Sequence, residues 1–569
     1  MRKDEEQNPP ENRNINTGGG NYNERIEGDY IQGNVFQNIF HLGGQTTTPV
    51  GNPARPKNER ILLAAVKEEV TARLRQSLHN AVLINLGKES QPQQVKRPWD
   101  AEIKIGSKPA EPLSDTTTIL QVFDSEEIAG KLLILGAPGA GKTTTQLELA
   151  QALVQRAEEQ PDYPVPVLFN LSSWKDDRQS LTDWLVAELK SKYGVSTKLG
   201  QDWVDNHQLL PLLDGLDELE PQRQELCVYA INQFLASETR PLYLVVCSRS
   251  EEYTNYATQL QLNGAIYLQP LTKNQIYDYL TSIKYIELWS IISNDINLLE
   301  LVKTPLLVSI TVLVYQEISI EEWQHLNSTA DRIQYLLDAY VGRMLIRNIN
   351  SRTYFQTKPP NAKRTRIWLV WLAQQMEGEA KTEFLIEEIQ PSLFKSKFPK
   401  IIYNLIVWGV IQMLISGLIS GLIFGLISGL IFGFHGLEIE NKTIPNQGIW
   451  QSAKNIVKLS ALLFFPSTIL IFLIQKILLN NSFNEALIFS LMSGLLLGLL
   501  VGIPRSGTPV IKHFILRLVL YCNGYIPWNY ARFLDYCTER MLLQRVGGRY
   551  RFIHKLLQDH FAQMEFKRN

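Results

Sequence analysis

The sequence predicts an α/β domain with a parallel sheet and helices on both faces. A helical domain, an α-helical transmembrane bundle and a small C-terminal tail are expected to follow. Three observations support this fold class. Short apolar runs alternate with helical patterns over residues 131–249, which is typical of a parallel sheet buried on both faces. A glycine-rich loop follows the first of these runs, and three long apolar runs lie beyond residue 400.

Composition bounds the possible functions. The chain has 569 residues and a formal net charge of −1, so it lacks the basic excess typical of nucleic-acid-binding proteins. Four cysteines are scattered without pairing or metal-ligand spacing, which indicates a reducing, intracellular compartment. Residues 1–60 contain ten Asn and eight Gly, so we expect a disordered tail there. A short adaptor element within this tail is the alternative.

The order of elements follows from the hydrophobic periodicity. Residues 61–114 are expected to form a lead-in helix and a proline-containing linker. The α/β core is placed at 115–270 and a helical domain at 271–395. Within the core we expect four strands, KLLILG, VPVLFNL, LLPLLD and PLYLVVCSR. The helices between them are expected at TTTQLELAQALVQRA, LTDWLVAELKSKY and QELCVYAINQFLA.

The glycine-rich loop carries the clearest chemistry. The segment GAPGAGKT, residues 136–143, matches the pattern G-x-x-x-x-G-K-[ST] between a strand and a helix, where backbone N–H groups cradle phosphates. Lys142 should reach the β- and γ-phosphates and Thr143 should bind Mg²⁺. The expected nucleotide-binding residues of this loop are Gly136, Gly139, Ala140, Gly141, Lys142, Thr143 and Thr144.

Acidic and basic residues at later strand ends complete the expected site. Asp214 ends an apolar strand and is predicted to be a second Mg²⁺ ligand. Asp217 or Glu218 would orient the attacking water, unless these acids only begin the next helix. Ser248 and Arg249 end the following strand and would face the γ-phosphate. The predicted catalytic residues are therefore Asp217, Glu218 and Arg249.

Together these segments resemble a NACHT domain, a P-loop NTPase of the signal-transducing class. The resemblance rests on LLILGAPGAGKTT, VPVLFNLSSW, LLDGLDEL, VVCSR and YLQPLTKNQIYDYL and extends over about residues 115–350. It implies ATP or ADP as ligand, a slow ATPase that acts as a switch, and oligomerisation. It also implies that Pro305, in KTPLLVSI, packs near the adenine. The segment RYRFIHKLLQDHF in the helical tail 505–569 resembles the end of the family's winged-helix region, which implies that His554 senses the ADP phosphate.

The apolar runs indicate a membrane region at 401–504. Ile401–Phe434 is 34 residues long without charge or histidine, and it carries a glycine at every fourth position from 417 to 433. Such a glycine stripe permits close helix packing, either within one chain or between subunits. Basic residues flank the region on both sides, so the NTPase and the tail 505–569 are expected in the cytoplasm. That requires an even number of crossings. Four are expected and two are the alternative, unless the runs are buried helices of a soluble protein.

Further segments resemble membrane-attached NACHT proteins of bacteria, among them TKPPNAKRTRIWLVWLAQQM and YARFLDYCTERMLLQRVGG. The resulting hypothesis is a multi-pass inner-membrane switch in bacterial signalling or defence. Its partners would be the lipid bilayer, copies of itself and a trigger ligand that the sequence does not identify. The alternatives are a continuously hydrolysing membrane ATPase and a passive scaffold that keeps a nucleotide for stability.

Overall fold

In the computed structural model, the described residues, which begin at Arg55, belong to one compact unit. The expected tail lies almost entirely outside the described residues, as does the glycine-rich run 416–434. The residues described are 55–77, 101–105, 111–113, 117–174, 178–349, 351–355, 357–389, 401, 403, 406, 447–502 and 508–565.

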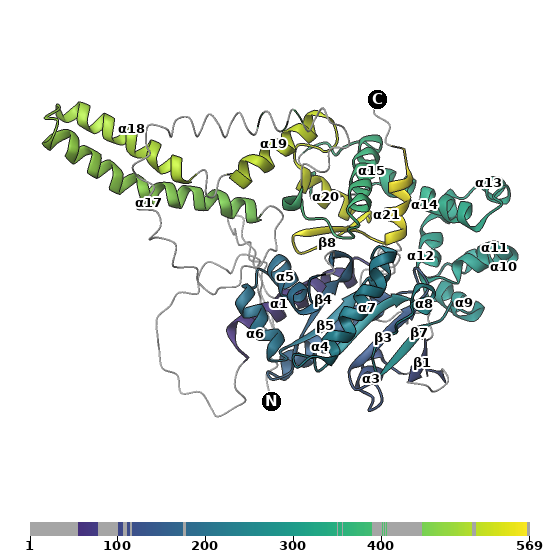
Figure 1. Cartoon of the computed structure of the whole chain (residues 1–569). Coiled ribbons are helices and arrows are strands. Elements are labelled where there is room, and N and C mark those ends of the chain that lie inside the picture. Colours follow the sequence, from purple (N-terminus) through teal and green to yellow (C-terminus); the bar gives the residue numbers. More distant parts are fainter. Residues whose placement is uncertain are drawn as a thin grey trace, which may run out of the picture. The chain divides into compact units, whose positions relative to one another are not determined.

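A seven-stranded sheet forms the α/β domain, with the strand order β2-β1-β7-β3-β6-β5-β4 (Figure 1). The predicted parallel sheet is confirmed, because β3 pairs in parallel with β6 and β7, and β5 pairs in parallel with β4 and β6. Continuous apolar sequences such as KLLILG favour these doubly covered positions. The parallel strands are β3 (Lys131–Gly136), β4 (Val165–Asn170), β5 (Leu209–Asp214), β6 (Leu244–Arg249) and β7 (Gly264–Leu268).

The expected linker contributes two strands to the sheet. β1 (Ala101–Ile105) runs antiparallel to β7, and the short β2 (Glu111–Pro112) pairs with β1. The sheet therefore begins before residue 115. The sequence AEIKI alternates apolar and polar residues, which is the pattern of a strand with one covered face. Because prolines stand on both sides of this segment, it was predicted to be part of a linker and not a strand.

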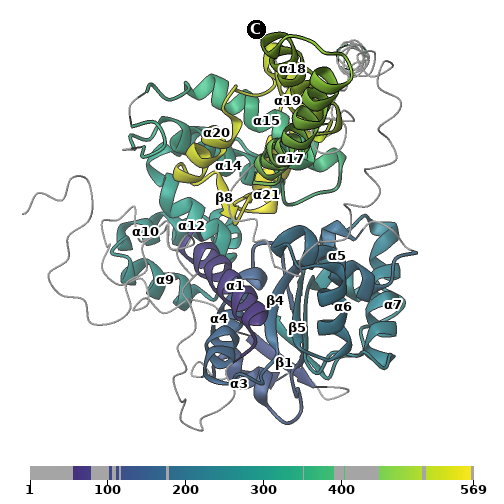
Figure 2. The same ribbon diagram turned by 90° about the vertical axis from the view of Figure 1, so that its left-hand side faces the viewer.

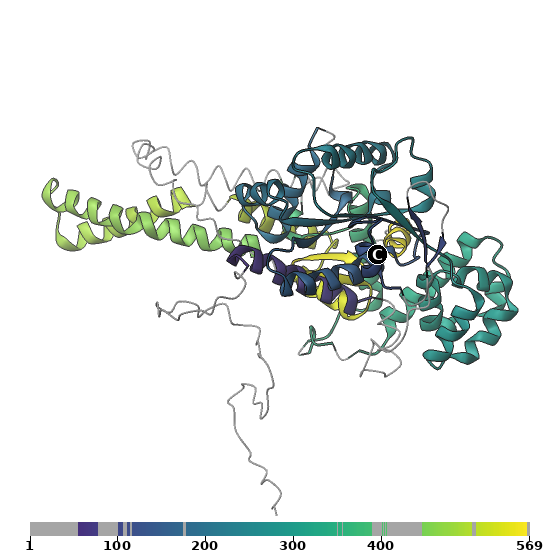
Figure 3. The same ribbon diagram turned by 90° about the horizontal axis from the view of Figure 1, so that it is seen from below.

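Helices cover both faces of the sheet (Figures 2 and 3). α1 and α4 lie on one face and pack against each other, whereas α5, α6 and α7 lie on the other face. Most of these helices begin at residues with the expected chemistry: the Ser180 hydroxyl accepts from Asp183 N, and Pro221 opens α7. The bounds are α1 (Lys57–Arg75), α3 (Ile119–Asp124), α4 (Lys142–Glu159), α5 (Leu181–Tyr193), α6 (Thr197–Asp205), α7 (Pro221–Ala236) and α8 (Ser250–Thr254).

The helical region and the C-terminal tail share one hydrophobic core, although the sequence divides them. Residues 271–389 and 515–562 contribute side chains to the same buried cluster. The Tyr340 hydroxyl donates to Met541 O at 2.6 Å, and Phe384 forms a β-bridge with Tyr550. The elements are α9 (Lys273–Ser282), α10 (Ile286–Asn294), α11 (Ile296–Val302), α12 (Pro305–Val314), α13 (Ile320–Gln324), α14 (Thr329–Ile346), α15 (Ala362–Gly378), α19 (Thr508–Cys522), α20 (Tyr530–Glu539), β8 (Leu543–Val546), β9 (Arg549–Phe552) and α21 (Lys555–Gln563).

Two apolar helices, α17 (Gln447–Ile477) and α18 (Phe483–Gly502), pack against each other (Figure 1). Within the described residues, one single helix segment, Val457–Ile477, is both long and apolar enough to cross a membrane, while Phe483–Leu497 is apolar but shorter. The expected bundle of four crossings is therefore not supported. Ile401–Phe434, which was to supply two of them, lies almost wholly outside the residues described.

Candidate functional site

The glycine-rich loop connects β3 to α4 in a conformation that depends on its glycines. Gly139 has a φ of +77° and Gly141 a φ of +97°, and α4 begins directly at Lys142. A β-carbon on Gly139 would lie 2.9 Å from Leu306 Cβ and from Thr304 Cγ2. The start of α12 thus packs tightly onto the loop, and only glycine leaves the room that this contact needs.

Lys142 and Thr143 open α4 directly after the loop, where the sequence pattern predicts contacts to phosphate and Mg²⁺. Lys142 Nζ donates to Gly136 O at 2.9 Å and to Ala137 O at 3.1 Å, so the ammonium lies folded over the loop. Thr143 Oγ1 donates to Asp214 Oδ2 at 2.9 Å. The two expected Mg²⁺ ligands therefore meet from α4 and β5.

Three acids stand at the carboxyl end of β5. Asp214 is its last residue, while Asp217 and Glu218 lie on the following 3₁₀ turn, Leu216–Glu218. Burial raises the pKa of Asp217, and this carboxylate contacts Arg249 Nε at 2.8 Å. Burial, followed by the charges of Asp214 and Asp217, raises the pKa of Glu218 to about 7. Its buried Oε2 has no hydrogen-bond partner in the described structure, so Glu218 is the acid available to accept a proton.

Arg249 reaches this site because β6 lies between β3 and β5. Its backbone pairs opposite Gly136, the first loop glycine. The guanidinium is also 3.0 Å from Glu252 Oε1. Arg249 is thus held by two carboxylates between the phosphate loop and the acidic turn. Ser248 is fully buried beside it.

Pro305 and His554 line the same cavity as the loop, although 249 positions of sequence separate them. Pro305 opens α12. His554 is the N-cap of α21, and its Nδ1 accepts from Leu556 N at 3.1 Å. Burial, followed by the charges of Lys142 and nearby arginines, lowers the pKa of His554 to about 3. The ring is therefore neutral, and with Nδ1 accepting, Nε2 carries the proton and can donate.

The cavity has a volume of about 160 Å³. The predicted site residues that line it are Gly139, Gly141, Lys142, Thr143, Thr144, Asp214, Asp217, Glu218, Arg249, Pro305 and His554. Gly136 and Ala140 do not line it. Gly136 instead ends β3, and Ala140 is a buried residue of the loop.

The residues present fit a magnesium nucleotide. The loop presents backbone N–H groups at the start of a helix, with Lys142 beside them. No cluster of three His, Cys, Asp or Glu suited to a metal occurs in the part of the chain that is described. Thr143 and Asp214 nevertheless suit Mg²⁺, which takes few protein ligands and completes its shell with phosphate oxygens and water.

Several residues of the cavity were not predicted from the sequence, and four of them carry a charged or amide side chain. Arg73 comes from α1, Gln544 and Arg551 come from the β8–β9 hairpin, and Lys555 opens α21. One signal was available for Arg73. Glu69 and Arg73 form an i, i+4 charge pair on the face of α1 that carries Leu62, Val66 and Val70, and a charge pair on a buried stripe indicates a specific role.

These features define a P-loop NTPase. The family model for the NACHT domain matches residues 131–285, and this segment of the chain is a NACHT domain. The match begins at the first residue of β3 and ends shortly after α9.

The other comparisons add little. Among solved structures, the crystal structure of Cdc6p from Pyrobaculum aerophilum is similar with 14% identity and a TM-score of 0.22, covering 45% of this chain and 70% of that one. No curated protein matches the chain.

Proposed function

We propose that the protein is a membrane-anchored, nucleotide-dependent molecular switch of bacterial signalling or defence. It binds ATP or ADP with Mg²⁺ and oligomerises when activated. One observation supports the switch function: residues from three regions of the chain line the cavity at the phosphate loop. The NACHT domain supplies Lys142 and Asp214, α12 supplies Pro305, and the C-terminal region supplies His554.

A ligand in this cavity would contact all three regions at once. Its phosphates would bind the loop and Lys142, and Mg²⁺ would bind between Thr143 and Asp214. The neutral ring of His554 would donate from Nε2 to a phosphate oxygen. A ligand can shift a conformational equilibrium only by binding one state better than the other. Contacts that span the three regions provide such a difference between a closed and an open arrangement.

Membrane anchoring is supported by the apolar surface of α17 and α18. Side chains of both helices are unusually exposed, with Phe465 at 64%, Ile469 at 61% and Met492 at 69%. An exposed apolar surface of this size usually contacts lipid or another protein. We assign it to the bilayer of the inner membrane, with the NACHT domain on the cytoplasmic side, where ATP is available. Oligomerisation rests on the family resemblance.

Continuous ATP hydrolysis is the second candidate function, and Glu218 favours it. Its pKa of about 7 suits a general base near neutral pH. A switch also needs some hydrolysis to reset, so the rate of turnover separates the two functions.

The test is nucleotide content and turnover of the full chain, purified in mild detergent. A switch predicts tightly held ADP and turnover below about 1 s⁻¹, slow against the median enzyme. Lys142→Ala should lose the nucleotide, whereas Lys67→Ala, which removes an exposed lysine on α1, should retain it. An empty site with fast, sustained turnover would replace the switch by the hydrolysing ATPase. Size-exclusion chromatography of the ADP and ATP forms checks oligomerisation.

A further inference from the structure

Arg73 lies in the nucleotide cavity although it belongs to a helix outside the NACHT domain. It is near the C-terminal end of α1, 58 residues before β3 begins. Only 4% of the residue is exposed, and it lines the cavity together with Lys142, Thr143 and Arg249. Its Nη2 is 3.9 Å from Asp214 Oδ2, the carboxylate expected to bind Mg²⁺.

The guanidinium of Arg73 makes weaker contacts than a buried charged group usually makes. Its two ion pairs, to Glu69 at 3.5 Å and to Asp214 at 3.9 Å, are both longer than a charged hydrogen bond. Its Nε finds no hydrogen-bond partner within the described residues. A buried guanidinium with donors to spare costs free energy unless a ligand uses them.

Arg55, which lies just before the N-cap Pro56 of α1, shows how a structural arginine of this protein is held. Its guanidinium donates to three backbone carbonyls around the end of α4 at 2.7 to 3.1 Å, and to Glu59 at 3.0 Å. Both arginines are buried, at 6% for Arg55 and 4% for Arg73. Neither Nε has a hydrogen-bond partner within the described residues, so the two arginines differ in their terminal nitrogens. Those of Arg55 connect α1 to α4 through short hydrogen bonds, whereas those of Arg73 line the cavity and make only long ion pairs.

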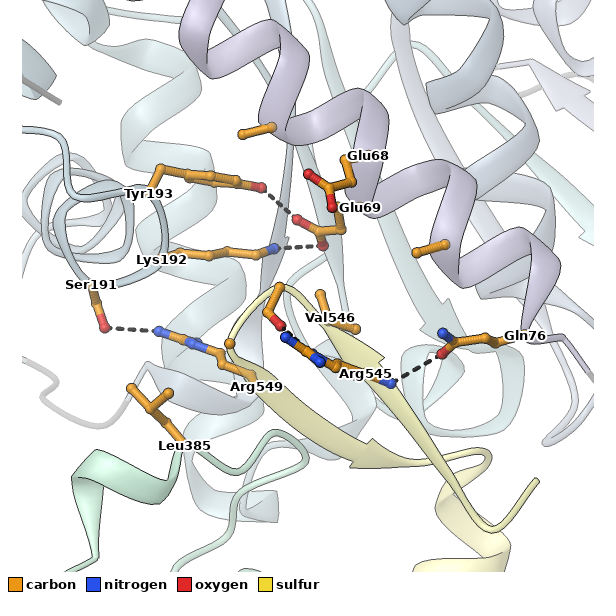
Figure 4. Close-up of a pocket in the computed structure, with 14 residues that line it drawn as sticks. Glu68, Glu69, Gln76, Ser191, Lys192, Tyr193, Leu385, Arg545, Val546 and Arg549 are labelled. Atoms are coloured by element: carbon orange, nitrogen blue, oxygen red, sulfur yellow. Dashed lines mark hydrogen bonds and ion pairs between the residues drawn. The ribbon is translucent and has the colours of Figure 1, made fainter. Parts of the chain in front are cut away.

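A second layer of contacts fixes the position of Arg73. Glu69 lies one turn earlier on α1 and is 5% exposed. Lys192 Nζ donates to its Oε1 at 2.8 Å, and the Tyr193 hydroxyl donates to its Oε2 at 2.7 Å (Figure 4). These bonds tie Glu69 to α5, on the side of a second cavity between α1 and the β8–β9 hairpin. Glu69 is thus held independently of Arg73 and can position it.

The charges that face the nucleotide cavity favour a polyphosphate. Its cations outnumber its anions, and Asp217 already neutralises Arg249. The cations are Arg73, Lys142, Arg249, Arg551 and Lys555, and the anions are Asp214, Asp217 and Glu218. Mg²⁺ held by Asp214 would weaken the attraction of that carboxylate for Arg73, and the guanidinium would then be available to phosphate oxygens.

We propose that Arg73 is a phosphate-binding residue of the nucleotide site, supplied by α1 from outside the NACHT domain and positioned by Glu69. The inference rests on the proposed nucleotide binding and assigns one further ligand to it. It also gives α1 a function. Through Arg73, this helix, which precedes the NACHT domain, would contact the phosphates of a bound di- or triphosphate directly.

The test compares the affinities of the full chain for ATP, ADP and AMP with Mg²⁺, measured by isothermal titration calorimetry. Arg73→Met keeps the apolar stem of the side chain and removes the charge. A lost charged hydrogen bond should weaken ATP and ADP about 10- to 100-fold, and AMP much less. Arg73→Lys should restore part of the loss, and Glu69→Gln should weaken ATP binding to a smaller extent. Lys67→Ala, on the same helix but away from the cavity, is the matched control.

The outcomes separate this inference from the proposed function. ATP and ADP binding that is unchanged in Arg73→Met but lost in Lys142→Ala would overturn the role of Arg73 and leave the nucleotide site intact. Unchanged binding in both variants would overturn both. Equal weakening of ATP, ADP and AMP, with a lowered melting temperature of the nucleotide-free variant, would show that Arg73 is only structural. If Arg73→Met does not fold, Arg73→Lys and Glu69→Gln carry the same comparison across the three nucleotides.

Discussion

Thr143 Oγ1 donates a hydrogen bond of 2.9 Å to Asp214 Oδ2, across 71 positions of sequence. This contact brings together two oxygen ligands of the kind Mg²⁺ prefers. It also joins the start of α4 to the end of β5, so the expected Mg²⁺ site depends on the packing of the sheet and not on one loop.

Asp214→Asn should remove most of the effect of Mg²⁺ on ATP binding. The amide can still accept from Thr143, but it lacks the charge that binds the cation. We expect ATP affinity in excess Mg²⁺ to fall about tenfold or more, with little change in EDTA. A magnesium titration of ATP binding measures this, with Thr143→Ser as a control that keeps the hydroxyl. An unaltered magnesium dependence in Asp214→Asn would contradict the assignment.

Glu218→Gln should reduce ATP turnover by about 100-fold or more, the usual contribution of a general base, while bound ADP is retained. Wild-type turnover should rise between pH 6 and 8, because the pKa of Glu218 is raised to about 7 and only the carboxylate accepts a proton. A flat pH profile would exclude Glu218 as the base.

The same carboxyl group affects stability, with a definite sign. The folded chain keeps a proton on Glu218 that the unfolded chain loses near the ordinary pKa of 4.5. The group therefore favours the folded state less as the pH rises from about 4.5 to about 7. Compared with wild type, the melting temperature of Glu218→Gln should fall less between pH 5 and pH 8. If the melting temperatures of the two proteins change in parallel with pH, Glu218 does not carry the proton in the folded chain.

Gly139→Ala should destabilise the contact between the phosphate loop and α12. The φ of +77° strains any other residue, and the new β-carbon would approach Leu306 and Thr304 to 2.9 Å. We expect a lower melting temperature together with weaker nucleotide binding. Gly342→Ala on α14, where a β-carbon meets nothing within 4 Å, is the control and should be neutral or stabilising by up to about 1 kcal/mol. Equal behaviour of the two variants would argue against a tight contact at the loop.

His554→Ala should speed the release of ADP, because a neutral donor near the phosphate would be lost. The substitution also removes the N-cap of α21, so a second variant is needed. His554→Asn keeps a side-chain acceptor for the cap while shortening the reach toward the phosphate. Stopped-flow release of a fluorescent ADP analogue distinguishes them. Release that is faster in both variants supports phosphate contact, whereas a change in His554→Ala alone would assign the histidine to the helix cap.

The sequence predicts the parts of this site that lie close to a strand end. The loop after β3 and the acids after β5 each follow a continuous apolar run, so their place at the sheet edge follows from local pattern. The strand β1 was missed because its five residues stand among prolines. Arg73 and Arg551 could not be placed, because only the packing of α1 and of the β8–β9 hairpin brings them to the loop. Pro305 and His554 were expected from resemblance alone, and no local pattern directs them to the cavity.

The hairpin of α17 and α18 should lie in a lipid environment. Its exposed side chains, including Ile469 at 61% and Met492 at 69%, would otherwise face water at a cost of about 25 cal/mol per Å² of apolar surface. Site-specific fluorescence tests this without interference from other apolar segments of the chain. Cys522 is exposed, whereas the other three cysteines are buried, so Cys522→Ser gives a background in which one introduced cysteine can be labelled.

In that background, Ile469→Cys and Met492→Cys carry an environment-sensitive dye after reconstitution into phospholipid vesicles. We expect a blue-shifted emission and protection from a water-soluble quencher at both positions. Phe355→Cys is the matched control, because Phe355 is 87% exposed and lies outside the hairpin, so its dye should report water. If all three dyes are quenched alike, the hairpin faces water and does not lie in lipid. A covering protein would also protect the two hairpin dyes, so cross-linking of the same cysteines between subunits is the second measurement, and efficient cross-links would assign the cover to a second copy of the chain.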